Sequence, residues 1–578
     1  MAGETRKNVY LPQLDEIRDA ILAGSTPGAS AVTLDALFQA MINGENTTKV
    51  FRDWWPLARA QDGASEDTTV ANRYHTLERW FTLLGKAWAG KYYTLRSADW
   101  RVSSAHAITP LGDLADRSAA ALATETSTDA FDWADEDPMT WYLRFNGASL
   151  SDGTMNVLAV EGVDDAFDIT GNTAPVYTGR LALFKRHYTD GSYEYKTFAT
   201  VYEGGFWPWA GDVDPTDNHH RPMNWEATFG GSMYGQKLTS GSGYKGLSWE
   251  SNGNTTAINK SAADGLTAAR KWNSYEGVYS DTDLEPILDL WQLRHFDLEN
   301  SGILEGCLNY NLDYTIAVAE ESVKSVVITT AQGENILIGS FLDVGSSARG
   351  GQRARGNVLR KETVNIEGTD YCRVHLDVST AFTTTAGDHV ATLPWTPGST
   401  EHLPGHKDGC LYNLTNGKTP ARIAGVEIID GGYAVGLDPL WSSDWDASRT
   451  PKSIYTVYVC RDSEDQASAV TNYTAAGTFT GPNSGWQYIK HFQIRTDGML
   501  VPEGCGESGA GSSAYLKSAF YFGDASGVRA PWRFCSLSSG DHGGLAGAAG
   551  NSTPSDAYWG ERPRLSGSGK KRGEWQAA

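Results

Sequence analysis

Residues that could bind a cation gather in one acidic stretch near position 215. Asp212, Asp214 and Asp217 recur at short spacing, and His219 and His220 follow them. Carboxylates spaced in this way can hold a hard cation, but the glycine turn and the distal glutamate of an EF-hand are not found here. We therefore interpret the stretch as a solvated acidic loop, and we predict neither a metal nor a cofactor for the chain.

Carboxylates could also form the acid and base pair of a glycosidase. Asp212, Glu226 and Glu250 are the candidates, and the tryptophans of Phe-Trp-Pro-Trp at 206–209 could stack on sugar rings. The sequence does not fix the separation of these carboxylates, which decides such chemistry. The chain also lacks the Gly-x-Ser-x-Gly, Walker and His-Glu-x-x-His motifs of common nucleophile, phosphate and zinc sites. We predict that it is not an enzyme and has no catalytic residues.

The cysteines are scattered, without a Cys-x-x-Cys pair or a histidine at a metal-binding spacing. They are Cys307, Cys372, Cys410, Cys460, Cys505 and Cys535. Isolated thiols are the better interpretation of such a pattern than a zinc site or a redox motif. A disulfide between Cys505 and Cys535 is conceivable, but a chain that folds in a reducing cytosol rarely depends on one.

Charge and hydropathy exclude two classes of partner. The chain of 578 residues has a formal net charge of -22, which repels phosphate backbones and anionic lipid, so we predict no nucleic-acid partner. Residues 1–10 carry Arg6 and Lys7 but no apolar run follows, which argues against a secretory signal. No stretch approaches the length that spans a bilayer, so we predict no membrane insertion.

The spacing of apolar residues changes along the chain from helical to alternating. This change predicts a multi-domain α+β protein. Apolar residues recur at helical spacing up to Tyr93, which predicts a helical region over residues 1–96. Short alternating runs then predict a β-rich domain over 97–312, with a helix at 284–296 near its end. Within it, the runs 180–188 and 193–202 flank an Asp-Gly pair, the strongest local signal for a β-hairpin.

Two further domains are predicted in the second half. Residues 313–400 show alternating runs typical of a small β-barrel or sandwich, and a Gly, Pro and His-rich stretch at 398–409 marks a boundary. In residues 401–578, the stretch from Val501 to Gly550 holds eleven glycines interleaved with aromatic residues. Such aromatics need to be buried, so we predict an ordered, irregular surface laid over a rigid scaffold.

The last sixty residues resemble a known family. The resembling parts are Trp532-Arg533, Gly543-Gly544-Leu545-Ala546-Gly547, Pro554-Ser555, Trp559, Arg564-Leu565-Ser566-Gly567 and Arg572-Gly573-Glu574-Trp575. They resemble the variable repeat of proteins targeted by diversity-generating retroelements, the family of the phage major tropism determinant. Glu561-Arg562-Pro563 departs from the usual pattern. The resemblance implies a C-terminal C-type-lectin-like fold with a variable region at about 528–575, in which template adenines are mutated while the scaffold stays constant.

The codon logic of this family divides the segment into variable and constant positions. Mutation of an asparagine codon at its two adenines gives small polar residues, tyrosine or histidine, but not tryptophan or glutamate. The implied ligand-binding positions are Ser538, Ser539, Asp541, His542, Asn551, Ser552, Asp556, Tyr558 and Gly560. The implied scaffold positions include Trp532, Gly543, Gly544, Leu545, Trp559, Arg564 and Trp575. Small polar and aromatic side chains on such a surface suit binding, as in antibody paratopes.

The resemblance implies a phage virion protein, made in the host cytoplasm, that recognises a receptor on the host cell surface from a tail fibre or tail tip. The expected partners are that receptor, a protein or a glycan, and other phage structural proteins, with residues 1–96 serving attachment or oligomerisation. A homotrimer is carried over from the family, and several copies would add avidity. The alternatives are a tail-borne glycan depolymerase and a bacterial or prophage-encoded surface adhesin.

Overall fold

The computed structural model describes residues 90–120, 139, 142–242, 260–298, 312–393, 421–507 and 516–575. Short gaps lie at 154, 162–165, 216–217, 219, 222, 429–431, 517, 535–541, 558–560 and 568–570. Thirty strands and three α-helices are found in the described residues, so the predicted α+β class is wrong and the described chain is mostly β-sheet. The α-helices are α5 (Ala262–Ala269), α6 (Asp281–His295) and α8 (Thr330–Asn335). None of the described helices is long and apolar enough to cross a membrane.

The predicted helical region ends in a strand. Residues 1–89 lie outside the described residues, but β1 (Tyr92–Ala98) is extended and pairs over its whole length with β7 (Tyr193–Ala199). Tyr93 and Leu95 are buried while their neighbours are half-buried, which is the period of two that a strand requires. The end of the range 1–96 is therefore not helical, because cross-strand pairing outweighs the helical spacing that precedes it.

Two sheets follow in the first half of the chain. The first has the order β2-β1-β7-β6-β8 and adds β2 (Thr109–Gly112), β6 (Phe184–Asp190) and β8 (Trp207–Pro208). The second has the order β4-β3-β5-β9 and contains β3 (Tyr142–Ser149), β4 (Met155–Val160), β5 (Val176–Leu181) and β9 (Met223–Ala227). A small hairpin joins β10 (Gly231–Tyr234) to β11 (Lys237–Ser240). The hairpin predicted around Asp190-Gly191 is confirmed as β6–β7.

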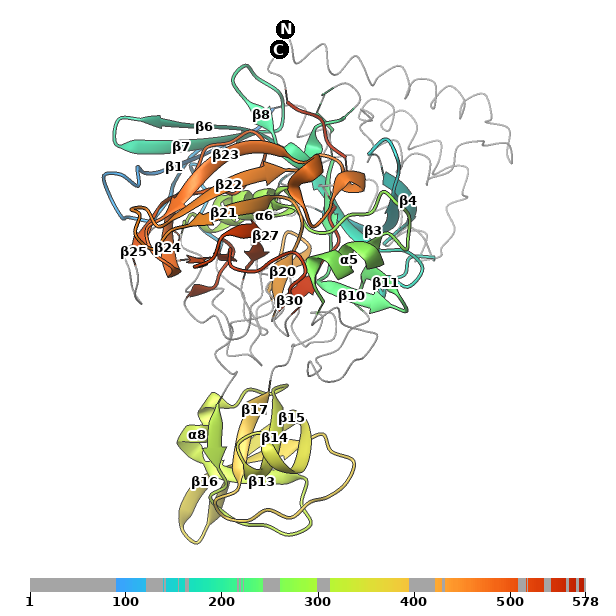
Figure 1. Ribbon diagram of the computed structural model, residues 1–578, viewed down its shortest axis with the longest axis vertical. Coiled ribbons are helices and arrows are strands. Elements are labelled where there is room, and N and C mark those ends of the chain that lie inside the picture. Colours follow the sequence, from blue (N-terminus) through green and yellow to red (C-terminus); the bar gives the residue numbers. More distant parts are fainter. Residues whose placement is uncertain are drawn as a thin grey trace.

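Helix α6 confirms the helix predicted at 284–296 and begins three residues earlier. Ser280 and Asp283 form a capping box, in which the Ser280 side chain accepts from the first turn and Asp283 accepts from the Ser280 backbone. Pro286 lies in the first two turns and Phe296 ends the helix in the left-handed conformation. Every residue of α6 is buried, because sheets from both halves of the chain surround it (Figure 1).

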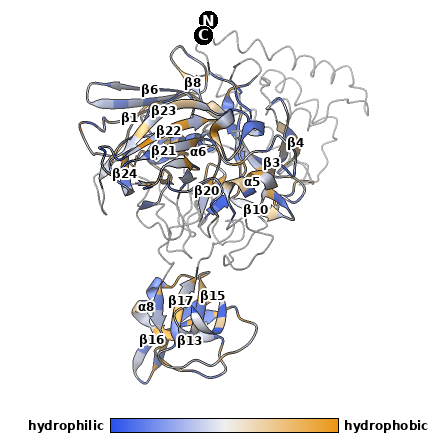
Figure 2. Ribbon diagram, viewed as in Figure 1, coloured by the Kyte–Doolittle hydropathy of each residue, from blue (hydrophilic) through white to orange (hydrophobic). Residues whose placement is uncertain are grey.

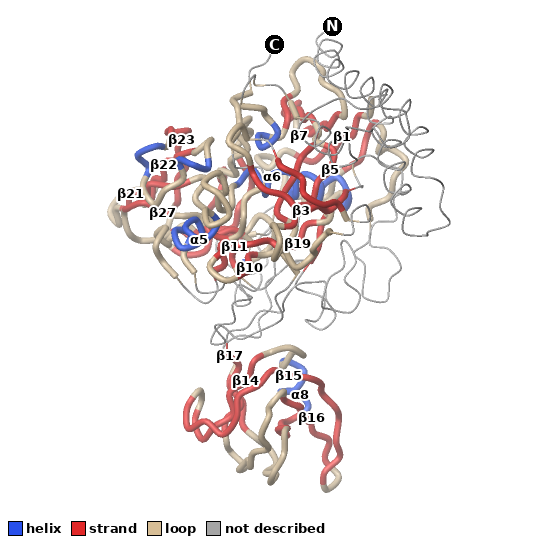
Figure 3. The backbone as a smooth tube through the Cα atoms, turned by 90° about the vertical axis from the view of Figure 1, so that its right-hand side faces the viewer, coloured by secondary structure: helices blue, strands red, loops and turns tan. Residues whose placement is uncertain are grey.

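Residues 312–393 form a separate six-stranded unit. Its order is β12-β17-β14-β15-β16-β13, and a bridge between Val318 and Val327 links the chain after β12 to β13 at the opposite edge. The strands are β12 (Asp313–Thr315), β13 (Ser325–Thr329), β14 (Phe341–Ser347), β15 (Gly350–Ile366), β16 (Thr369–Leu376) and β17 (His389–Leu393). Figures 1 and 3 both show this unit beside, and not within, the larger body.

Residues 421–575 add two larger sheets and a short hairpin. The hairpin pairs β18 (Ala421–Ile423) with β19 (Val426–Ile428). The four-stranded sheet, in the order β23-β22-β21-β27, contains β21 (Leu440–Trp445), β22 (Ser453–Val459), β23 (Thr474–Gly481) and β27 (Gly527–Arg529). The seven-stranded sheet has the order β25-β24-β26-β29-β28-β20-β30. Its strands are β20 (Tyr433–Val435), β24 (Gly485–Phe492), β25 (Pro502–Glu507), β26 (Ala519–Phe522), β28 (Trp532–Arg533), β29 (Ala548–Ala549) and β30 (Glu561–Pro563).

The C-type-lectin-like fold expected for residues 401–578 was part of the predicted α+β class, and it is corrected together with that class. The described part of 421–575 holds sheets and two single-turn 3-10 helices, at Ser463–Asp465 and Val470–Asn472, and no α-helix. The helices that pack near these sheets, α5 and α6, come from residues before the six-stranded unit. The described residues of 401–578 therefore do not form the expected C-type-lectin-like fold by themselves.

The buried apolar residues form two main cores. The larger one takes residues from both 93–296 and 423–565, and the smaller one takes residues 316–390 of the six-stranded unit. Figure 2 shows hydrophobic and hydrophilic residues interspersed along the strands of both parts, as expected for sheets with one buried face. The four predicted ranges, 1–96, 97–312, 313–400 and 401–578, stay predictions, and the larger core joins residues of the first, the second and the fourth.

Candidate functional site

The segment 527–575, which carries the resemblance, is threaded into both C-terminal sheets. Strand β27 lies at the edge of the four-stranded sheet, while β28, β29 and β30 lie in the seven-stranded one. Strand β30 pairs in parallel with β20, and β28 pairs with β20 from the other side. The ends of the segment are thus fixed by backbone hydrogen bonds, and the residues between them are carried on this frame.

A buried ion pair ties the start of the segment to helix α6. Arg533 donates from Nε to Oδ1 of Asp281 at 2.7 Å and from Nη2 to Oδ2 at 2.5 Å, and both side chains are at most 2% exposed. The guanidinium also lies 5.3 Å from the centre of the Trp441 ring. Burial raises the pKa of Asp281 to about 6, although Arg533 opposes that shift. The pair fixes β28 against the first turn of α6.

The motif Arg564-Leu565-Ser566-Gly567 binds the same helix turn. Ser566 donates to Oδ2 of Asp283 at 2.8 Å, and the Gly567 N–H donates to Oδ1 at 2.8 Å. A side chain at Gly567 would approach the Glu226 backbone to 2.3 Å, which explains why glycine stands there. Arg564 donates to the backbone carbonyls of Glu427 and Ala227 at 2.5 and 2.6 Å.

The motif Arg572-Gly573-Glu574-Trp575 is anchored in a similar way. Arg572 donates to Oδ2 of Asp438 at 2.7 Å, and both side chains are at most 2% exposed. A side chain at Gly573 would meet the carbonyl of Asp214 at 2.4 Å. The Trp575 ring lies 5.5 Å from that of Tyr202. Arg572, Gly573 and Trp575, which belong to the resembling motif, therefore make contacts that hold the chain end against the rest of the protein.

The predicted scaffold residues in the described part are buried or half-buried. Trp532 packs against Tyr433 with ring centres 5.0 Å apart, and Leu545 is fully buried. Gly543 and Gly544 are buried in the turn before β29. Trp575 is half-buried, and Arg564 is buried. Trp559 lies outside the described residues.

The predicted ligand-binding residues separate into three groups. Asn551 and Asp556 are exposed, and His542 is half-exposed with its ring stacked on Trp486, 4.9 Å away and 3° from parallel. Ser552, in contrast, is 5% exposed, and its carbonyl accepts from the Ala530 N–H at 3.0 Å. The positions outside the described residues are Ser538, Ser539, Asp541, Tyr558 and Gly560.

No family model matches the chain, and no similar protein was found among the curated proteins.

The acidic stretch near 215 is largely paired within the protein. Asp212 is buried and accepts from Asn224 at 2.9 Å, and burial raises its pKa well above the ordinary value. Asp214 pairs with Arg221 at 3.5 Å, and the ring of His220 lies 3.9 Å from that of Phe184. Asp217 and His219 lie outside the described residues. Where it is described, the stretch is a packed turn, so the predicted solvated loop is wrong for Asp212.

The carboxylates considered for a glycosidase pair are similarly placed in the interior. Glu226 is buried beside Arg180, with 2.5 Å between Oε1 and Nη2, and burial raises its pKa to about 7. Glu250 lies outside the described residues. Glu226 and Asp212 are each about 2% exposed, so neither carboxylate offers a surface position to a long sugar chain.

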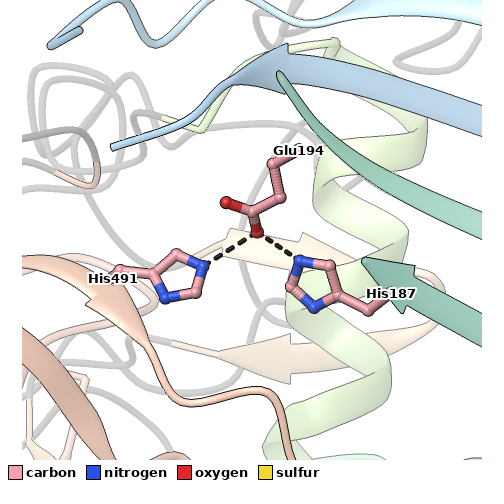
Figure 4. Close-up of side chains that lie close together, drawn as sticks. All are labelled: His187, Glu194 and His491. Carbon is pink, nitrogen blue, oxygen red and sulfur yellow. Dashed lines mark hydrogen bonds and ion pairs between the residues drawn. The ribbon is translucent and has the colours of Figure 1, made fainter. Parts of the chain in front are cut away.

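Sequence reasoning missed a cluster of two histidines and a glutamate. His187, Glu194 and His491 bring their side chains together, and both imidazole Nε2 atoms contact Oε1 of Glu194 (Figure 4). Burial lowers the pKa of His187 to about 4, whereas the carboxylates of Glu194 and Glu503 raise that of His491. His187 and Glu194 flank the predicted hairpin turn, so the sequence could have indicated that these two residues lie close together. Nothing in the sequence indicates that His491 joins them.

The cysteines in the described part are free. Cys372, Cys460 and Cys505 form no disulfide, and burial raises the pKa of Cys460 and of Cys505 to about 12. A thiol with such a pKa is hardly ionised at neutral pH and is a poor nucleophile. Cys460 and Cys505 are therefore chemically inert at neutral pH.

The first prediction concerns the ion pair that holds β28. Arg533→Ala leaves the Asp281 carboxylate buried without its cation, so we expect the free energy of unfolding to fall by about 3–5 kcal/mol. The control is Arg461→Ala, which removes an exposed ion pair to Glu574 in the same region and should cost less than about 1 kcal/mol. Denaturant unfolding at pH 7 measures both; equal losses would contradict the anchoring role.

The second prediction concerns Glu561, which directly follows Gly560, a ligand-binding position implied by the resemblance. Burial, and then the Asp556 carboxylate, raise the pKa of Glu561 to about 9, and its Oε1 has no hydrogen-bond partner. Between its ordinary pKa and 9, the folded chain keeps a proton that the unfolded chain releases, so stability falls as pH rises through this window. Glu561→Gln cannot ionise, and we expect it to be more stable than the wild type at pH 8 by at least about 1.4 kcal/mol.

The same variant should match the wild type near pH 4, where both side chains are neutral. Unfolding curves at the two pH values make the comparison. If Glu561→Gln is the less stable protein at pH 8, the carboxyl is ionised in the folded state and the assignment fails.

Proposed function

We propose that the chain is a phage virion protein that binds a host cell-surface receptor through diversified residues of 538–560. The observation that carries the proposal is that this segment and its flanks contain both buried anchoring residues and solvent-exposed residues. The constant residues Arg533, Leu545, Arg564 and Arg572 are buried and tied to the body, whereas Asn551 and Asp556 face solvent.

Such an arrangement suits a protein that changes its contact residues while keeping its fold. Exposed side chains contribute little to stability, so their replacement is tolerated. The anchors on either side keep the backbone in place, which limits the entropy that binding must overcome. Positions 555–557 are all exposed, and the N–H of Thr553 donates to Oδ2 of Asp556 at 2.7 Å, which orders this turn.

Aromatic rings around His542, another implied ligand-binding position, support the same function. The stacked pair His542 and Trp486 lies beside Tyr521, whose ring is 5.2 Å from that of Trp486. All three are partly exposed. Rigid aromatic surface next to short polar side chains is the composition of binding loops that must suit varied ligands. A receptor of protein or of glycan would find both kinds of contact here.

The third prediction tests this surface directly. The combined variant His542→Ala, Asn551→Ala and Asp556→Ala should bind host cells at least about tenfold more weakly, because a tenfold loss is about 1.4 kcal/mol and a single central contact residue supplies that much. Its stability should fall by no more than about 1–2 kcal/mol, the scale of one ring contact and one exposed hydrogen bond. Binding of the labelled full chain to a panel of bacterial strains gives the readout.

The matched control changes three exposed residues of the six-stranded unit, Glu321, Lys324 and Glu334, to alanine. It should bind as the wild type does. Wild-type adsorption by the variant of 542, 551 and 556 would overturn the proposal, as would an equal loss in the control.

The fourth prediction concerns the gene. If the segment is diversified, the genome should hold a near-copy of the DNA that encodes it, next to a reverse transcriptase gene. The two copies should differ mainly at adenines of the template, and the differences should fall on codons of the exposed positions and spare those of Arg533, Arg564 and Arg572. Differences spread evenly over buried and exposed codons would contradict diversification.

A further inference from the structure

The hairpin β6–β7 places a histidine and a glutamate on one face. His187 pairs across the strands with Lys196, and Thr189 pairs with Glu194, so Glu194 is the diagonal neighbour of His187. Diagonal neighbours share a face of the sheet, and long side chains bridge the distance between them. Figure 4 shows the imidazole of His187 directed at the carboxylate of Glu194.

The third group comes from a distant part of the chain. His491, near the end of β24, places its Nε2 2.8 Å from Oε1 of Glu194. Its other ring nitrogen, Nδ1, lies 3.2 Å from Oε2 of Glu503 on β25. Trp100 stacks on the His491 ring with centres 5.9 Å apart and planes 15° from parallel. The ring is thus held in position from two sides.

We propose that His187, Glu194 and His491 bind one divalent transition-metal ion, with Zn²⁺ as the best match. The three ligand atoms lie within 4.8 Å of one another. Two imidazole nitrogens and one carboxylate oxygen form a ligand set that zinc accepts, whereas calcium and magnesium prefer oxygen ligands throughout. This site is independent of receptor binding, because it uses no residue of the segment 538–560.

The contact between His491 and Glu503 is the second observation that points to a metal. Histidine ligands commonly donate their remaining ring N–H to a carboxylate, which orients the ring and makes the ligating nitrogen more basic. Glu503 accepts from Nδ1 in this way, so that Nε2 of His491 is directed at the site beside Oε1 of Glu194.

The surroundings suit a bound cation with one open position. The side chains of His187, Glu194 and His491 are only 12–14% exposed, so little water competes for the ion. All three residues line a cavity of about 100 Å³, which also reaches Lys196 and Trp207. Three protein ligands and a water from the cavity would complete the usual four-coordinate zinc geometry. The ion would clamp the hairpin β6–β7 to strands β24 and β25.

The fifth prediction is one equivalent of tightly bound metal per chain. The purified full chain, stripped with a chelator, is titrated with Co²⁺, whose visible spectrum reports tetrahedral coordination, and Zn²⁺ then displaces it. We expect a saturating signal at one Co²⁺ per chain and a higher unfolding temperature with Zn²⁺ than with chelator. A proton-bridged cluster without metal would give no saturable spectrum and the same unfolding temperature in both buffers, which would overturn the proposal.

Variants distinguish this site from adventitious binding. His491→Gln should abolish stoichiometric binding, and Glu503→Gln should weaken it about 10–100-fold, because it removes only the orienting partner. The control is His375→Gln, which breaks a comparable pair of histidine and glutamate at 2.8 Å in the six-stranded unit. It should keep one equivalent. If His491→Gln does not fold, Glu503→Gln decides; unchanged affinity in that variant would refute the assignment.

Discussion

The first turn of α6 is the point on which the C-terminal architecture depends. Ser280 and Asp283 cap the helix, and the carboxylates of Asp281 and Asp283 then bind residues from 533, 566 and 567. Ser280 also donates to Asp438 at 2.7 Å, the same carboxylate that holds Arg572. A helix N-terminus favours negative charge, so these buried acids are partly stabilised before any arginine reaches them.

This concentration of charge means that the buried ion pairs contribute more to the stability of the segment than its exposed side chains do. Removing one member of a buried ion pair costs several kcal/mol, whereas exposed substitutions away from such pairs usually cost little. Buried and exposed positions occur together along 533–575, because some side chains reach inward to α6 and its neighbouring strands whereas others face solvent. Ser552 shows the limit of the codon argument, since its small polar type matched the exchangeable class but its side chain is buried.

Local features were predictable from the sequence and long-range ones were not. The Asp-Gly turn fixed the β6–β7 hairpin, and apolar spacing gave α6 to within a few residues, because both depend on neighbours in the chain. The strand at Tyr92–Ala98 was missed because its partner lies a hundred residues away. Arg533 and Asp281 are 252 positions apart, and His491 is 297 from Glu194, so no local pattern could indicate either contact.

The same separations constrain how the chain folds. Residues 312–393 make most of their contacts with one another, so this unit can fold as soon as it is complete. The larger core cannot, because β30 must reach β20 and Ser566 must reach Asp283, 283 positions earlier. Contacts of such separation slow folding and leave partly folded chains exposed. Until the last fifty residues arrive, Asp281 lacks its cation Arg533, and Asp283 lacks its donors Ser566 and Gly567. A desolvated core around these acids is then unfavourable. The segment that carries the proposed receptor contacts is therefore also the one that completes the interior.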